Sequence, residues 1–130
     1  MTHSILTMIR EGVPDLVALY EFGSSARGEV RRDSDLDLAF LARLALPSLA
    51  RWELQERLAV ELGRDVDLVD LRTASAVLKA QVITTGSILV DVDASERHRF
   101  EMYSLSDYAR LNEERRPVLK RIEREGAVHA

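Results

Sequence analysis

The chain contains no cysteine, which excludes a disulfide framework, cysteine-ligated zinc, iron–sulfur clusters and thiol catalysis. Long apolar runs are also missing. The longest stretch without a charged residue, Ala80–Val90, has 11 residues, whereas a membrane-spanning helix needs about 20. Met1–Ile9 lacks the basic start and the small-residue cleavage site of a signal peptide. We therefore expect a cytoplasmic protein with no membrane partner.

Positive charge is in short supply. The 18 basic side chains are outnumbered by 22 acidic ones, so the net charge is -4. Proteins that bind long nucleic acids usually carry a positive surface that displaces counterions from the phosphates. We therefore expect no direct nucleic-acid partner.

No internal repeat, low-complexity tract or linker rich in proline and glycine interrupts the 130 residues, and this length suits one domain. The apolar content of 46% and charged content of 31% are typical of a globular chain. We expect a core over residues 1–94 and a helical extension over residues 95–130 that packs on it.

Short apolar segments alternate with longer helical patterns along the core. The pattern predicts strands at 16–22, 34–41, 65–71 and 88–92, and helices at 3–11, 25–29, 48–62 and 75–85. Strands separated by helices predict an α/β (α+β) fold, in which helices flank a small mixed sheet.

The C-terminal part reads as helical from about Ser95 to Glu125. Pro117 removes a backbone donor and clashes with the preceding turn, so we expect the helix to kink or split there. Tyr103 and Tyr108 are expected to pack against the core. Trp52, in the helix over 48–62, is also expected in the core.

Two aspartates open the second predicted strand. Residues i and i+2 of a strand project to the same face, so the side chains of Asp35 and Asp37 point together. Like charges held this close repel unless a cation lies between them. A hard divalent cation resolves the repulsion, and Mg²⁺ fits when phosphates complete its shell.

The third predicted strand repeats this design with Asp67. If this strand neighbours the second, Asp67 joins Asp35 and Asp37 in a cluster of three carboxylates. Two metal ions in such a cluster stabilise the attacking and leaving oxygens of a phosphoryl displacement. Asp65 and Asp70, by contrast, are expected to be surface or capping residues.

Gly23-Ser24 supplies a matching phosphate site. Glycine lets the backbone turn and approach a ligand closely, and the start of the following helix exposes unpaired N–H groups. Those groups and the Ser24 hydroxyl suit the phosphates of a nucleotide. Arg27 could add positive charge to the same phosphates, or it could pair with a nearby carboxylate. Lys79 could also reach phosphate, but a solvated helix face is the favoured interpretation.

Gly23-Ser24, ten residues and then Asp35-x-Asp37 together resemble the signature of the polymerase β-like nucleotidyltransferases. With Ala26-Arg27-Gly28 between them, the segment is similar to the minimal nucleotidyltransferases (MNT), and the likeness covers essentially the whole chain. The short length is similar to that of the MNT antitoxins encoded beside HEPN ribonuclease toxins. The resemblance implies the polymerase β-like fold, with its catalytic core over residues 1–94.

The resemblance also implies an activity: transfer of AMP from ATP, with Mg²⁺, to a tyrosine hydroxyl of a cognate HEPN toxin, which silences the toxin. By position, Asp35 and Asp37 would bridge two metal ions and Asp67 would complete the catalytic one. Gly23 and Ser24 would hold the triphosphate, with Arg27 as an additional contact.

Two alternatives remain open at this point. The chain could neutralise a toxin by masking it, with the metal site dispensable. It could also modify a small hydroxylated molecule, although enzymes of that kind generally carry an extra domain to hold the acceptor.

Overall fold

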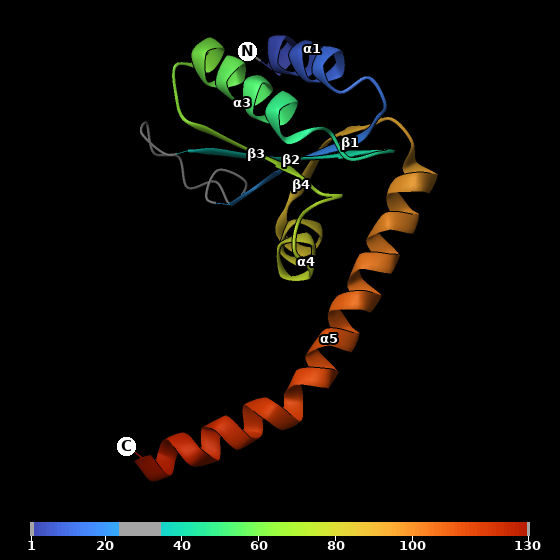
Figure 1. Ribbon diagram of the computed structural model, residues 1–130. Helices are drawn as coiled ribbons and strands as arrows, with labels where there is room; N and C mark the ends of the chain where they lie inside the picture. Colours follow the sequence, from blue (N-terminus) through green and yellow to red (C-terminus); the bar gives the residue numbers. More distant parts are fainter. Residues whose placement is uncertain (1, 24–34, 130) are drawn as a thin grey trace.

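The computed structural model describes residues 2–23 and 35–129 (Figure 1). The elements follow in the order α1 (Thr2–Gly12), β1 (Leu16–Phe22), β2 (Leu36–Ala42), α3 (Ser48–Leu62), β3 (Val66–Asp70), α4 (Ala76–Thr85), β4 (Ser87–Asp91) and α5 (Ala94–His129). This order confirms the predicted alternation of strands and helices. The helix expected at 25–29 lies outside the described residues.

The four strands form one sheet in the order β3-β2-β1-β4. β1 is antiparallel to both β2 and β4, whereas β2 and β3 are parallel. Parallel neighbours need a crossover connection, and α3 provides it. The prediction of a small mixed sheet flanked by helices is confirmed. Because β2 and β3 are parallel, their first residues lie at the same end of the sheet.

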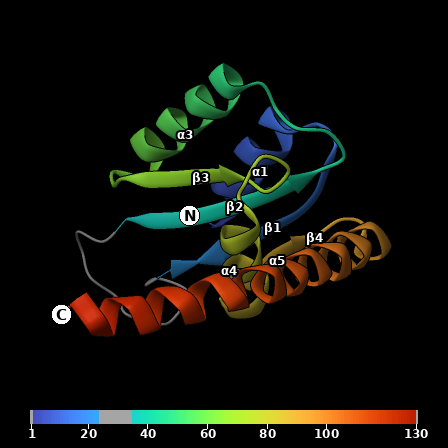
Figure 2. The same ribbon diagram turned by 60° about the horizontal axis from the view of Figure 1, so that its bottom comes forward.

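α1 and α3 cover one face of the sheet (Figures 1 and 2). Leu54 and Leu58 of α3 are buried there, as the i, i+4 spacing requires. α3 ends where predicted, because Gly63 adopts a φ of 63° and its N–H bonds to the carbonyl of Ala59. Trp52 on the same helix is 50% exposed, so its expected place in the core is wrong.

α4 and the first part of α5 cover the opposite face (Figure 2). Ser75 caps α4, since its hydroxyl accepts a hydrogen bond of 3.1 Å from the Leu78 N–H. Val82 of α4 and Phe100 of α5 are buried against Tyr20 in this second core. This is the face toward which the odd-numbered residues of β2 point.

α5 is longer than the core that it packs on, and it leaves the body of the molecule (Figure 1). It runs through Pro117 without a break, so the helix does not split, and its axis changes direction along the outer part. Tyr103 is 79% exposed, so its expected packing role is wrong. Along the described residues, no helix combines the length and apolar character that crossing a bilayer requires.

Candidate functional site

Two of the predicted acidic residues face each other across the parallel strands. Asp37 of β2 and Asp67 of β3 are direct register partners. Asp35 immediately precedes β2 and is exposed, as is Asp67, whereas Asp37 is half-buried. Asp37 shares its side of β2 with Ala39, which belongs to the core under α4 and α5. The acids therefore lie at one end of the sheet, on the face that carries α4 and α5.

At this end of the sheet the carboxylates repel one another when the chain binds no ligand. Burial raises the pKa of the Asp37 carboxyl above its usual range, and the negative charges of Asp67 and then Asp35 raise it further. A nearby cation would reverse this effect, because it favours the charged form of each carboxylate. Carboxylate oxygens are the ligands that Mg²⁺ takes in proteins. The donor set at this end therefore fits a hard divalent cation.

The carboxylates are not already gathered around a metal position. In the part of the chain that the structure describes, no group of three acidic, histidine or cysteine residues is arranged to hold a metal ion. Asp37 and Asp67 are paired by strand register, and Asp35 lies close enough to raise the pKa of Asp37. The three-aspartate metal site stays a prediction.

Gly23 lies directly against the carboxylate of Asp37. The last residue of β1, Phe22, pairs with Asp37, and Gly23 follows with a φ of 74°. A Cβ atom added at Gly23 would lie 2.2 Å from Oδ2 of Asp37. Only glycine therefore allows both this turn and this carboxylate position. Ser24 and Arg27, predicted to contact the phosphates, lie outside the described residues.

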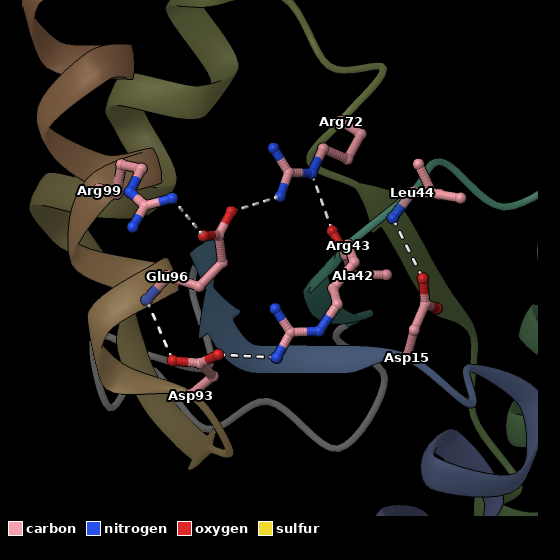
Figure 3. A network of polar contacts seen from close by, with 8 residues as sticks. All are labelled: Asp15, Ala42, Arg43, Leu44, Arg72, Asp93, Glu96 and Arg99. Atoms are coloured by element: carbon pink, nitrogen blue, oxygen red, sulfur yellow. Dashed lines mark hydrogen bonds and ion pairs between the residues drawn. The ribbon is translucent and has the colours of Figure 1, made fainter.

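The opposite end of the sheet anchors α5 (Figure 3). Asp93 accepts a hydrogen bond of 3.1 Å from the Glu96 N–H, which caps the helix, and one of 2.7 Å from Arg43. The Glu96 carboxylate lies between Arg72 and Arg99, at 3.3 Å from each. Arg72 also donates to the carbonyl of the last residue of β2 at 2.8 Å. These contacts join α5 to the far ends of β2 and β3.

A second polar network joins α5 to the centre of the sheet. The Tyr20 hydroxyl donates to Glu101 at 2.9 Å, and Arg97 donates to the other oxygen of Glu101 at 2.6 Å. Arg97 also bonds Asp91 of β4 at 3.0 Å. Burial, followed by the charge of Glu101, raises the pKa of the Tyr20 hydroxyl, so it stays protonated and remains a donor. The network fixes the position of α5 over the face that carries the acids.

Asp70 is a buried residue that caps backbone N–H groups of two neighbouring segments. It is only 3% exposed, and its carboxylate accepts hydrogen bonds from the N–H groups of Leu46 at 2.8 Å and Arg72 at 2.9 Å. It therefore joins the loop after β2 to the turn after β3. Asp65 and Asp70 are both expected from the sequence to be surface or capping residues: Asp65 is exposed, and Asp70 has the capping role but is buried. The sequence contains one signal of this burial, because Asp70 lies on the apolar side of its strand.

Comparison with known proteins gives consistent results. Residues 5–95 match the family described as polymerase beta, nucleotidyltransferase. The protein adenylyltransferase MntA of Shewanella oneidensis is 41% identical over 117 residues, which are 90% of this chain and 84% of that protein.

Two solved structures resemble almost the whole chain. One is a toxin–antitoxin with AMP-PNP, with a TM-score of 0.86 and 39% identity over 94% of this chain and 98% of the other. The second holds tri-AMPylated Shewanella oneidensis HEPN toxin in complex with MNT antitoxin. Its TM-score is 0.80, with 37% identity over 94% of this chain and 95% of the other.

Proposed function

Because the chain belongs to the polymerase β nucleotidyltransferase family, we propose that it is an MNT antitoxin that transfers AMP from ATP to a tyrosine hydroxyl of a cognate HEPN ribonuclease toxin. Membership makes the chain a nucleotidyltransferase. The protein acceptor is supported by the relative named protein adenylyltransferase and by the related complex with AMPylated HEPN toxin. ATP as donor is supported by the related complex with AMP-PNP.

The observation that carries the proposal is the placement of Asp37. Its carboxylate faces Asp67 across the parallel strands, and it lies against the backbone of Gly23. Carboxylates that repel one another beside a glycine turn are costly for a protein that binds nothing there. The same arrangement is useful to an enzyme that handles a metal–nucleotide complex.

We assign the metal site to Asp35, Asp37 and Asp67. When bound there, Mg²⁺ ions supply positive charge that stabilises the attacking and leaving oxygens of an in-line phosphoryl displacement. Asp37, half-buried between two strands, has the more restricted position. Asp35 and Asp67 are exposed and free to adjust their carboxylates.

We assign the phosphate site to Gly23, Ser24 and Arg27. Gly23 has no side chain, so the phosphates can approach the backbone beside Asp37. Backbone N–H groups after such a turn, the Ser24 hydroxyl and the Arg27 guanidinium are suitable donors to phosphate oxygens.

The reaction balances with ATP and the acceptor alone. The tyrosine oxygen forms a bond to the α-phosphorus of ATP, the bond from that phosphorus to the bridging oxygen breaks, and pyrophosphate leaves. The tyrosine proton is released. The role of the chain is to orient the acceptor oxygen in line with the leaving pyrophosphate.

We further propose that residues 1–94 form the catalytic core and residues 95–130 an extension that packs on it. The family match over residues 5–95 supports this division. The contacts of Glu101 and Phe100 with the sheet support packing for the first part of the extension.

The test is transfer of label from α-labelled ATP to the cognate HEPN toxin. We expect a labelled toxin tyrosine with wild type and Mg²⁺, and none with Asp35→Asn, Asp37→Asn. The control is Glu53→Gln, Glu61→Gln, which also removes two negative charges, at exposed positions on α3. Absence of label on the toxin with wild type would overturn the proposal. Full rescue of toxin-expressing cells by the double variant at matched expression would favour masking instead of catalysis.

A further inference from the structure

Tyr103 lies between two hollows beside α5. One hollow, of about 350 Å³, lies between α4 and α5, and the other, of about 540 Å³, continues along α5. Tyr103 and Arg99 line both. We call this region the α4–α5 surface, and its principal residues are Arg72, Lys79, Arg99, Phe100, Tyr103 and Arg110.

The charge of this surface differs in sign from that of the chain. Four cations line the two hollows, against the two carboxylates of Glu96 and Asp107, whereas the whole chain carries a net charge of -4. Glu96 is already engaged by Arg72 and Arg99, and Asp107 by Arg110. The surface is therefore a local excess of positive charge on an acidic protein.

Lys79 is the cation of this surface whose charge is least compensated. Its ammonium lies 5.7 Å from the centre of the Phe100 ring, with the Arg72 guanidinium at 5.1 Å from the same ring. No ion pair joins Lys79 to a carboxylate within residues 2–23 and 35–129. A half-buried ammonium on an aromatic ring keeps its position but lacks a counter-charge. A carboxylate from a partner would supply one.

Apolar groups on the same surface are available for contact. Tyr103 is 79% exposed and Met102, which lines the second hollow, is 54% exposed. Tyrosine and arginine are, with tryptophan, the side chains most enriched among the residues that dominate protein interfaces. An exposed tyrosine between two hollows, surrounded by arginines, has the composition of such an interface centre.

The surface is within reach of the predicted catalytic end. α4 and α5 cover the face toward which Asp37 points. Asp67 and Arg72 are five residues apart, in β3 and just after it, so their backbones are at most about 16 Å apart. A standard interface covers about 800 Å² per partner and is roughly 30 Å across. One bound protein can therefore contact this surface and place a residue at the acids.

We propose that the α4–α5 surface docks the acceptor protein, through an acidic segment of that protein that pairs with Lys79 and apolar side chains that enclose Tyr103. The inference rests on the proposed function, because it names the surface that holds the toxin during transfer. It adds a positioning role for residues outside the predicted metal and phosphate sites.

The experiment is calorimetric titration of the cognate HEPN toxin with wild type and four variants of the full chain. Lys79→Glu reverses the unpaired charge and Tyr103→Ala removes the exposed ring. Lys79→Arg keeps the charge, and Arg57→Glu makes an equal charge reversal on α3, across the sheet. We expect Lys79→Glu and Tyr103→Ala each to weaken binding at least about tenfold, while Lys79→Arg and Arg57→Glu bind like wild type. Circular dichroism verifies that each form is folded.

Label transfer in the same preparations separates this inference from the proposed function. If wild type binds the toxin but transfers no label, the proposed function is overturned. If Lys79→Glu and Tyr103→Ala still bind the toxin more weakly in that case, the docking surface is retained. Label transfer with unchanged toxin affinity in Lys79→Glu and Tyr103→Ala would overturn the docking surface alone. Self-association that Lys79→Glu abolishes, with toxin affinity unchanged, would assign the surface to a second copy and also overturn it.

Discussion

Replacement of Gly23 by alanine is expected to stop transfer by moving one carboxylate. The new Cβ atom would lie 2.2 Å from Oδ2 of Asp37, and a carbon and an oxygen in contact need more than 3 Å. Either the turn or the carboxylate must therefore move by about 1 Å. A displacement of that size at a reacting centre costs about 100-fold in rate. We expect a loss of that order in AMP transfer by Gly23→Ala.

The chain contains a matched control for this prediction. Gly63, after α3, has a φ of 63°, close to the 74° of Gly23, but an added Cβ there would meet nothing within 4 Å. A non-glycine residue in this conformation costs about 1–2 kcal/mol, partly offset by the lower entropy of the unfolded chain. The strained backbone should therefore lower the free energy of unfolding of both variants by about 1 kcal/mol, which corresponds to about 4 °C in melting temperature.

The two variants should differ in activity far more than in stability. The assay compares initial rates of label transfer from ATP at saturating Mg²⁺, and melting curves provide the stability of each variant. If Gly23→Ala and Gly63→Ala retain transfer rates within threefold of each other, the assigned contact between Gly23 and Asp37 has no catalytic role. Lower stability of Gly23→Ala with an unchanged rate would refute the reasoning in the same way.

Three further predictions concern carboxylates and their partners. Asp37→Asn should be more stable than wild type without Mg²⁺, because it removes a half-buried charge that Asp67 and Asp35 repel. Mg²⁺ should raise the melting temperature of wild type but not of this variant. Chelation with EDTA should abolish wild-type transfer. Asp70→Ala leaves two backbone N–H groups without their acceptor and should cost about 2 kcal/mol in urea denaturation; a change below 0.5 kcal/mol would contradict this role. Tyr20→Phe removes the hydrogen bond to Glu101 and should cost about 1.5 kcal/mol by the same measurement, with transfer retained at temperatures where the variant is folded.

Local patterns were sufficient to predict the elements that the structure describes. The strand Leu16–Phe22 and the helix Ser48–Leu62 have the bounds that apolar periodicity, Pro47 and Gly63 indicate. The pairing of Asp37 with Asp67 required one assumption, that the third strand neighbours the second, and the parallel register confirms it. These features could be predicted because they depend on side-chain periodicity and on turn residues that act locally.

Other features depend on which distant segments meet. Asp70 is buried because the loop that contains Leu46 lies over it, and nothing near Asp70 in the sequence indicates that loop. Tyr103 lies three residues after the buried Phe100, a position that periodicity assigns to packing, but periodicity does not report where the core ends. Trp52 lies two residues before Leu54, so it points away from the buried side of α3, and its size alone suggested packing. Pro117 is tolerated within α5 because the outer part of that helix is exposed and can bend, as Figure 1 shows.

The carboxylates at the two ends of the sheet differ in how well their charges are compensated. At the end that anchors α5, Asp70 and Asp93 accept hydrogen bonds from backbone N–H groups. At the other end, Asp37 is half-buried beside Asp67 with a raised pKa, a situation that costs stability. Sequences are expected to violate such local rules mainly where binding or chemistry compensates the cost. The anchored end gives the sheet and α5 fixed positions, and this rigidity holds the repelling carboxylates together for the cation and nucleotide that we assign to them.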